Sequence, residues 1–275
     1  MSKLYVVGTP IGNLGDFSPR AVETLQSVDF IAAEDTRVTL KLLNRFGIKK
    51  SMVSYFEHNK RERGEMITSR ILGGESCALV TDAGMPAISD PGEDLVRLCH
   101  EKGIRVESVP GPCAFTTALA LSGFPSGRFT FEGFLSVNKP SRREHLQSLE
   151  NETRTMLFYE APHKLGATLR DMNKVFGNRE IAIVREITKL HEEVIRTTLD
   201  EAVEKYADGS VKGEIVLVIK GAEKAEAGDE MTFEQAVECA KQSVEDGMSV
   251  SEAAKQAAKL SGFKKGDIYK SLIGE

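Results

Sequence analysis

The feature that most constrains this fold is a repeated alternation of short apolar runs with segments of helical period. Between the runs, apolar residues recur at three- and four-residue spacing, as on one face of an amphipathic helix. Strands joined by helices need crossover connections, which favour a mainly parallel sheet covered on both faces. The sequence therefore predicts an α/β domain over about residues 1–120. Its expected strands lie at residues 4–7, 30–33, 52–55, 77–80 and 104–109.

The following hundred residues predict a second α/β domain, at about residues 121–224, with a mixed sheet. Only some of its strand-like runs are separated by helical segments, and connections around residues 189–198 and across Gly209 to Gly213 favour antiparallel pairs. The expected strands lie at residues 129–135, 155–159, 181–184, 194–198 and 215–219.

The remaining residues, 225–275, predict a small all-helical C-terminal extension. It follows AEKAEAGDE at residues 222–230, which has no apolar side chain larger than alanine and is typical of a linker. An alanine-rich helix, a turn at Gly262 and a short helix opened by Lys264 and Lys265 resemble a helix-turn-helix. The same pattern is equally typical of a plain helical hairpin that covers the main body.

Composition limits both the compartment and the kinds of ligand. The 275 residues, 41% of them hydrophobic and 28% charged, are ordinary for a globular protein. We find no signal-peptide pattern and no apolar run that could cross a membrane, so a cytoplasmic location is expected. The four cysteines show no close pairing, which favours free thiols and predicts no metal site. A net charge of -5 argues against indiscriminate binding to a polyanion but leaves room for a local basic face.

Ligands of open parallel sheets bind beyond the carboxyl ends of the strands. The first such loop, GTPIGN at residues 8–13, has glycines that let the backbone approach a ligand and a proline that stiffens it. Its spacing is not the GxGxxG of dinucleotide sites, and it lacks the Gly-Lys-Ser/Thr of a phosphate loop.

Two further strand-end loops carry candidate site residues. Asp82 directly follows a strand, where a carboxylate can accept hydrogen bonds from ribose hydroxyls or an amino group. We expect Asp90 to N-cap the next helix, with Pro91 at its first position. In the third loop, a Pro-Gly-Pro turn brings Cys113 and Ala114 to the start of a helix. A nucleophilic cysteine would need a histidine base, for which the sequence offers no motif, so Cys113 is interpreted as a small wall residue.

Six motifs of the chain are informative together: GTPIGN (8–13), AEDTR (33–37), SDPG (89–92), PGPCA (110–114), EGFL (132–135) and YEAPH (159–163). Their combination resembles the ribosomal RNA small subunit methyltransferase I family, a branch of the tetrapyrrole methylase superfamily of S-adenosylmethionine-dependent methyltransferases. The resemblance spans about residues 3–224. It implies the two-domain tetrapyrrole methylase-like fold, S-adenosyl-L-methionine bound in the cleft between the domains, and a homodimer. It also implies 2′-O-methylation of a cytidine ribose in the decoding region of 16S rRNA of the small ribosomal subunit.

The same resemblance assigns contacts with the cofactor to residues of these loops. They are Thr9, Pro10, Ile11, Asp82, Gly84, Met85, Cys113, Ala114 and Tyr159. Tetrapyrrole-modifying members have a glycine-rich first loop where this chain has Thr9 and Pro10. Members of the closer branch usually have threonine at the position of Met85.

Methyl transfer to a ribose hydroxyl would benefit from a general base, because the hydroxyl is a poor nucleophile and must lose its proton. The sequence leaves the choice of base open among the candidates Glu34, Asp35, Glu160 and Glu186. Basic residues could hold phosphates of the RNA, although each is also typical of a solvated or salt-bridged surface. These candidates are Arg37, Arg142, Arg143, Arg185, Lys189, Lys264 and Lys265.

Two other functions are compatible with the motifs. One is a methyltransferase that acts on a tetrapyrrole or corrin precursor, against which GTPIGN and the basic helical tail argue. The other is a noncatalytic module that binds S-adenosylmethionine or RNA, which would bind the cofactor tightly without turnover.

Overall fold

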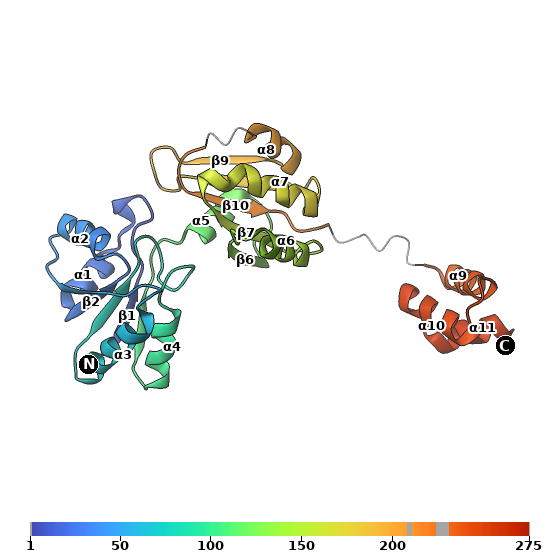
Figure 1. The fold of residues 1–275 in the computed structure, drawn as a ribbon, viewed down its shortest axis with the longest axis horizontal. Coiled ribbons are helices and arrows are strands. Elements are labelled where there is room, and N and C mark those ends of the chain that lie inside the picture. Colours follow the sequence, from blue (N-terminus) through green and yellow to red (C-terminus); the bar gives the residue numbers. More distant parts are fainter. Residues whose placement is uncertain (1, 208–210, 224–230, 275) are drawn as a thin grey trace. The chain divides into compact units, whose positions relative to one another are not determined.

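The chain divides into two compact units, Met1–Ala222 and Glu223–Glu275 (Figure 1). The structure is a computed structural model that describes residues 2–207, 211–223 and 231–274. Most of the expected linker at residues 222–230 lies outside the described residues. The larger unit contains two five-stranded sheets, and the smaller unit contains helices.

The first sheet is entirely parallel, as the sequence predicts, with the strand order β3-β2-β4-β1-β5. Each expected apolar run forms a strand, and only the ends of β3 and β5 differ by one or two residues from the prediction. The strands are β1 (Leu4–Val7), β2 (Phe30–Ala33), β3 (Ser51–Ser54), β4 (Cys77–Val80) and β5 (Val106–Val109).

Helices cover both faces of this sheet, and its central strands β1, β2 and β4 bury side chains on both sides. On one face Val7, Ile31 and Val80 share a core with residues of the first two helices, and on the other Leu4 and Leu79 share a core with residues of the next two. Ser18 caps the first helix as predicted, with its hydroxyl accepting a hydrogen bond from the Ala21 N–H at 3.1 Å. The helices are α1 (Pro19–Ser27), α2 (Thr36–Arg45), α3 (Lys60–Leu72) and α4 (Glu93–Glu101).

The helix that follows β4 covers the opposite face of the sheet from the helices that follow its neighbours β1 and β2. β1 and β2 are followed by α1 and α2 on one face, whereas β4 is followed by α4 on the other (Figure 1). At such a reversal the strand-end loops diverge, which leaves a crevice outside the carboxyl ends of the strands. The topology thus places a ligand site beside the ends of β1 and β4.

Backbone contacts join the three loops that follow β1, β4 and β5. A Cβ atom added to Gly8 would lie 2.7 Å from Cα of Gly111, so the first and third loops touch where neither residue has a side chain. Thr9 and Gly84 form a β-bridge, in which each N–H donates to the other residue's carbonyl oxygen. The buried Thr9 hydroxyl also donates to the carbonyl oxygen of Thr81 at 3.1 Å. These contacts fix the three loops as one surface.

The second sheet is mixed, as expected, with the order β6-β7-β10-β8-β9. β6 and β7 are parallel and the other neighbours are antiparallel. The register of β6 shifts between Phe131 and Gly133, where a bulge bends the strand. The strands are β6 (Phe129–Phe134), β7 (Thr155–Glu160), β8 (Glu180–Arg185), β9 (Glu193–Thr198) and β10 (Ile215–Ile219).

One helix links the two sheets. α5 (Ala114–Ser122) begins at the loop after β5, yet Ala118 and Leu119 pack against Leu157 and Val216 of the second sheet. The expected domain boundary at residue 120 falls inside this helix. The opposite face of the sheet shares a core with residues of α6 (Lys139–Ser148), α7 (Leu165–Phe176) and α8 (Leu199–Lys205).

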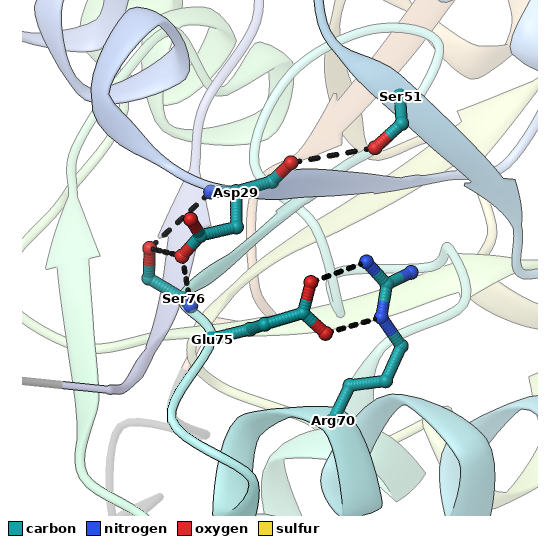
Figure 2. A network of polar contacts seen from close by, with 5 residues as sticks. All are labelled: Asp29, Ser51, Arg70, Glu75 and Ser76. Atoms are coloured by element: carbon teal, nitrogen blue, oxygen red, sulfur yellow. Dashed lines mark hydrogen bonds and ion pairs between the residues drawn. The ribbon is translucent and has the colours of Figure 1, made fainter.

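A polar network ties together the amino ends of the first sheet's strands (Figure 2). The Asp29 carboxylate accepts hydrogen bonds from the Ser76 N–H at 2.6 Å and hydroxyl at 2.7 Å, and these hydrogen bonds lower the pKa of Asp29. Ser51 donates to the carbonyl oxygen of Asp29, and Arg70 pairs with Glu75 through two hydrogen bonds. Polar contacts therefore close this edge of the sheet, at the ends of the strands opposite the crevice.

The smaller unit has a core of its own. α9 (Phe233–Glu245), α10 (Val250–Ser261) and α11 (Lys265–Ile273) enclose buried alanines together with Val237 and Ile268. Ser249 caps α10, and Gly262 ends it with a φ of +75°. The predicted turn and second helix are present, but the core needs α9 as a third helix. No helix within the described residues is long and apolar enough to span a membrane.

The Gly8–Gly111 contact can be tested with an alanine. Gly8→Ala should lower the free energy of unfolding by about 1 to 3 kcal/mol, because its methyl group would overlap backbone that cannot rotate away. Calorimetric melting of the full chain measures the effect. Gly127→Ala is the matched control, since a Cβ there meets nothing within 4 Å and its φ is not positive. Equal melting temperatures for the two variants would contradict this account of the loops.

Candidate active site

A cavity of about 400 Å³ lies where the strand-end loops of the first sheet face the second sheet. Its volume falls in the range of small-molecule sites. Six of the residues assigned to the cofactor line it, and the second sheet adds the paired ends of β7 and β10. The six are Ile11, Gly84, Met85, Cys113, Ala114 and Tyr159.

The other three residues assigned to the cofactor are not among those that line the cavity. Thr9 is 1% exposed and uses its hydroxyl and backbone to hold the turn after β4. Pro10 lies between Thr9 and the lining residue Ile11. Asp82 accepts a hydrogen bond from the N–H of Asp35 at 3.1 Å, which connects the loops after β4 and β2.

Two strained loops border the cavity. In the described part of the chain, the non-glycine residues with positive φ are Ala87 and Ser89 in the turn after β4, and Glu186 and Thr188 in the loop after β8. Their φ values lie between 50° and 67°. Each such residue costs about 1 to 3 kcal/mol, and this kind of strain concentrates at functional sites. Ser89 lines the cavity, as does Ile187 between the two strained residues of the other loop.

Asp90 does not cap α4, so this prediction is wrong. Gly92 stands at the N-cap with a φ of 151°, no side chain caps the helix, and the helix begins at Glu93. A Cβ on Gly92 would lie 2.9 Å from Leu79, so the chain crosses the β4 face there without a side chain. Pro91 and Gly92 therefore separate Asp90 from the helix, and Asp90 lies in the wall of the cavity.

The half-buried Asp90 is the acid that sequence reasoning missed. Burial raises its pKa to about 6, and the nearby carboxylates of Glu34 and Asp82 contribute to the increase. The signal was hidden because an Asp-Pro pair before a helical pattern is the usual signature of a cap. Only the path of the turn distinguishes the two roles.

The candidate bases after β2 are already engaged. The Asp35 carboxylate accepts hydrogen bonds from the Arg37 N–H and guanidinium, which lower the pKa of Asp35 to about 2. The Glu34 carboxylate accepts a hydrogen bond from the Thr81 hydroxyl at 2.6 Å. Neither Glu34 nor Asp35 is among the residues that line the cavity.

The candidate bases on the second sheet are held by neighbours as well. Glu160 lines the cavity and is 6% exposed, and its oxygens accept from the Ala161 N–H and the Thr168 hydroxyl. Glu186 does not line it. Its carboxylate accepts from Lys189 at 2.8 Å and from the Glu214 N–H at 3.0 Å, and these contacts lower the pKa of Glu186.

Aromatic side chains form one wall of the site. The centroid of the Tyr159 ring lies 5.0 Å from the ring centroid of Phe131 and 5.3 Å from that of Phe134. Burial raises the pKa of Tyr159, so its phenol stays neutral at physiological pH. Phe134 lines the cavity and is 59% exposed, so its ring presents an apolar face to solvent beside the cavity.

Four of the basic candidates for RNA contact are paired with acids. Arg37 pairs with Asp35, and Arg142 with Asp171. Arg185 pairs with Glu193, and Lys189 with Glu186 and Glu214. Arg142 keeps only 13% of its side chain exposed, whereas Arg37 keeps 87%.

The other three basic candidates are exposed. The side chain of Arg143 on α6 makes no hydrogen bond or ion pair with a described residue. Lys264 is the N-cap residue of α11, and Lys265 donates to the Ser251 hydroxyl at 3.0 Å. Arg143 lies in the larger unit and the two lysines in the smaller one.

The residues of the cavity fit an S-adenosylmethionine cofactor. Its walls are mainly apolar and suit an adenine ring and a thioether chain, while the Gly84 turn has a φ of +88° and offers backbone without a side chain. Asp90 and Glu160 supply carboxylates, which favour a sulfonium cation. When bound, the cofactor supplies a methyl carbon activated for displacement. No group of three or more metal-ligating side chains occurs among the described residues.

Comparisons with known proteins agree with this site. The model of the Tetrapyrrole (Corrin/Porphyrin) Methylases matches residues 3–203. A "Ribosomal RNA small subunit methyltransferase I" from Synechocystis is 50% identical over 81% of this chain and 80% of its own. Another, from Thermotoga maritima, is 49% identical over 81% of this chain and 100% of its own.

This chain belongs to the ribosomal RNA small subunit methyltransferase I family. A solved structure of uroporphyrin-III C-methyl transferase from Thermus thermophilus, complexed with S-adenyl homocysteine, has the same fold at 17% identity. Its TM-score is 0.53, over 79% of this chain and 97% of that one. The chain is an S-adenosylmethionine-dependent methyltransferase with the tetrapyrrole methylase fold.

Filling the cavity should weaken binding of the cofactor. Ala114→Leu adds three carbon atoms to the wall. We expect the Kd for S-adenosylmethionine, measured by calorimetric titration, to rise about 5- to 150-fold, because overpacking costs about 1 to 3 kcal/mol. Ala120→Leu is the matched control, because Ala120 lies exposed on the same helix. If both variants bind like the parent, the cofactor does not lie against Ala114.

Proposed function

We propose that this enzyme methylates the ribose 2′-hydroxyl of a cytidine in the decoding region of 16S rRNA, within the small ribosomal subunit. The observation that carries the proposal is the family membership, at 49–50% identity to relatives named for small-subunit ribosomal RNA. The motif AEDTR, which carries part of the resemblance, forms the loop after β2. The loop after β1 closes on the turn after β4 through the Thr9–Gly84 bridge.

The architecture suits a direct displacement between a held cofactor and an entering nucleotide. Such a reaction needs the methyl carbon and the attacking oxygen in line and in contact, and alignment can supply about 7 to 11 kcal/mol of the barrier. The rigid loops would hold the cofactor. The exposed ring of Phe134 would stack on a splayed base, as aromatic side chains do in sites that recognise single-stranded RNA.

Charge in the smaller unit is segregated in a way that suits one RNA-binding face. Residues 249–273, which contain α10 and α11, carry five lysines and two acidic residues, whereas residues 232–247 around α9 carry one lysine and four acidic residues. Lys264, Lys265 and the exposed Tyr269 lie on the basic side. We infer that α10 and α11 face phosphates and that α9 faces away.

The smaller unit would therefore add affinity for RNA rather than chemistry. The Thermotoga maritima relative is matched along its whole length by 81% of this chain, and the unmatched remainder is about as long as Glu223–Glu275. The cavity is built from the larger unit alone. On the larger unit, Arg143 and Arg37 offer the most exposed of the predicted phosphate contacts.

The homodimer and the cytoplasmic location are also proposals. The resemblance to the family supports the first, and sedimentation equilibrium of the full chain tests it. A ribosomal substrate supports the second.

Transfer of label from S-adenosylmethionine tests the proposed function. The purified protein is incubated with labelled cofactor and either small ribosomal subunits from cells that lack the modification or a corrin precursor. We expect label in 16S rRNA as 2′-O-methylcytidine, located by nuclease mapping. Label on a corrin precursor would instead identify a tetrapyrrole methyltransferase. Tight cofactor binding with no transfer to either acceptor would identify a noncatalytic module.

The predicted basic face is tested by charge reversal. The double variant Lys264→Glu/Lys265→Glu should weaken binding to small subunits and reduce the slope of log Kobs against log salt by about two, because two phosphate contacts are lost. Its Kd for S-adenosylmethionine should match the parent's. Lys241→Glu on the acidic helix α9 is the control and should leave the slope unchanged. Parental binding and slope in the double variant would place the RNA elsewhere.

A further inference from the structure

We propose that Asp90 is the general base that accepts the proton of the attacking ribose hydroxyl. This assignment rests on the proposed function, since it names the residue that would assist the same reaction. The side chain lines the cavity that fits the cofactor. It lies on the turn after β4, between the strained residue Ser89 and the helix N-cap Gly92.

The backbone of this turn places Asp90 at a local cost. Ala87 and Ser89 both have φ near 65°, a region that non-glycine residues rarely adopt. A direct start of the helix at Pro91 would have used Asp90 as an ordinary cap and avoided this path. The chain instead holds a carboxyl group in the cavity wall without a cap hydrogen bond to α4. Strain of this kind is typical of positioned functional groups.

The other acids near the site are occupied. Among the acids that line the cavity, Glu160 is buried and accepts two hydrogen bonds, and Glu214 pairs with Lys189 at 3.2 Å. Asp35 is held by Arg37, and Glu186 by Lys189. The described structure gives Asp90 no ion pair. It therefore has a basic oxygen to offer a hydroxyl group at the cavity.

Two carboxylates that face Asp90 favour its protonated form, whereas the Thr81 hydroxyl favours its ionised form. Glu34 from the loop after β2 and Asp82 from the end of β4 act on it as negative charges, and the Thr81 hydroxyl lies beside it. Tyr159 faces it from the second sheet as a neutral phenol. Burial and these carboxylates raise the pKa of Asp90 to about 6. A base of this strength is ionised at pH 7 yet accepts a proton more readily than an ordinary aspartate.

In the proposed step, methyl transfer to the ribose is coupled to transfer of the hydroxyl proton to Asp90. The ribose O2′ forms a bond to the methyl carbon as the carbon–sulfur bond breaks, and the electron pair of that bond stays on sulfur. The hydroxyl proton passes to a carboxylate oxygen of Asp90. Release of that proton to solvent restores the base.

Substitution by the isosteric amide tests the assignment in two ways. In single-turnover methylation of small subunits, the parent rate should rise with pH through about 6 and then level. Asp90→Asn should lose this limb and react at least about 100-fold more slowly, because general-base assistance contributes about 10² to 10⁴. The rates are compared at saturating S-adenosylmethionine, because loss of the Asp90 charge should also weaken binding of the sulfonium cation. A parental rate with an unchanged limb would overturn the assignment.

The second readout needs no RNA. The pKa of Asp90 is raised in the folded protein, so ionisation between the unfolded value of 3.8 and about pH 6 destabilises the parent but not the amide variant. The melting temperature of Asp90→Asn relative to the parent should therefore increase by about 5 to 10 °C between pH 4 and pH 8. A difference that does not change with pH would show that Asp90 is not the titrating acid and would overturn the assignment.

Asp94→Asn is the matched control from α4. Lys60 lowers the pKa of Asp94, so the melting temperature of this variant relative to the parent should fall over the same pH range. Its methylation rate and pH limb should match the parent's. A parent that labels no ribosomal RNA would end the proposed function and this assignment together. A parent that labels RNA, with an equally active Asp90→Asn, would end the assignment alone.

Discussion

The close approach of Gly8 and Gly111 is the contact on which the rest of the site depends. Parallel strands bring their carboxyl ends to one edge of the sheet, but their loops would diverge at the reversal between β1 and β4. The two glycines let the loops after β1 and β5 touch, and the Thr9–Gly84 bridge joins the loop after β4 to them. Once joined, the loops form one wall of the cavity, and the second sheet can close the other.

α5 completes this arrangement because it belongs to both halves. Its first residue, Ala114, lines the cavity at the end of the third loop, while Ala118 and Leu119 pack beneath β7 and β10. Packing between the sheets therefore sets the distance between the walls. The boundary that the strand–helix alternation predicts at residue 120 misses this, because α5 continues the loop after β5 of the first sheet and packs in the core of the second.

Elements with a strong local signal could be predicted from the sequence. β1, β2, β4 and β10 have the predicted bounds, since each is a short apolar run bounded by breakers, and Ser18 caps its helix as expected. Six of the residues that the family resemblance assigns to the cofactor line the cavity, and their contacts with the cofactor stay a prediction. Asp90 could not be found this way. Its local signature is that of a cap, and only Gly92, which crosses close to Leu79, shifts the helix start and turns the acid into the cavity.

The acids around the loops show how environment assigns roles to one chemical group. The Asp35 carboxylate accepts hydrogen bonds from the Arg37 guanidinium, which lower the pKa of Asp35 to about 2. Asp35 therefore serves as the N-cap of α2 and as an ion-pair partner. Asp90, about as near the strand ends, meets carboxylates and burial instead and has its pKa raised to about 6. When their surroundings shift the pKa values of two like groups in opposite directions, one group can have a structural role and the other a chemical role. Here the two roles follow from the position of Arg37 beside Asp35 and from the strained backbone of Ala87 and Ser89, which places Asp90 at the cavity.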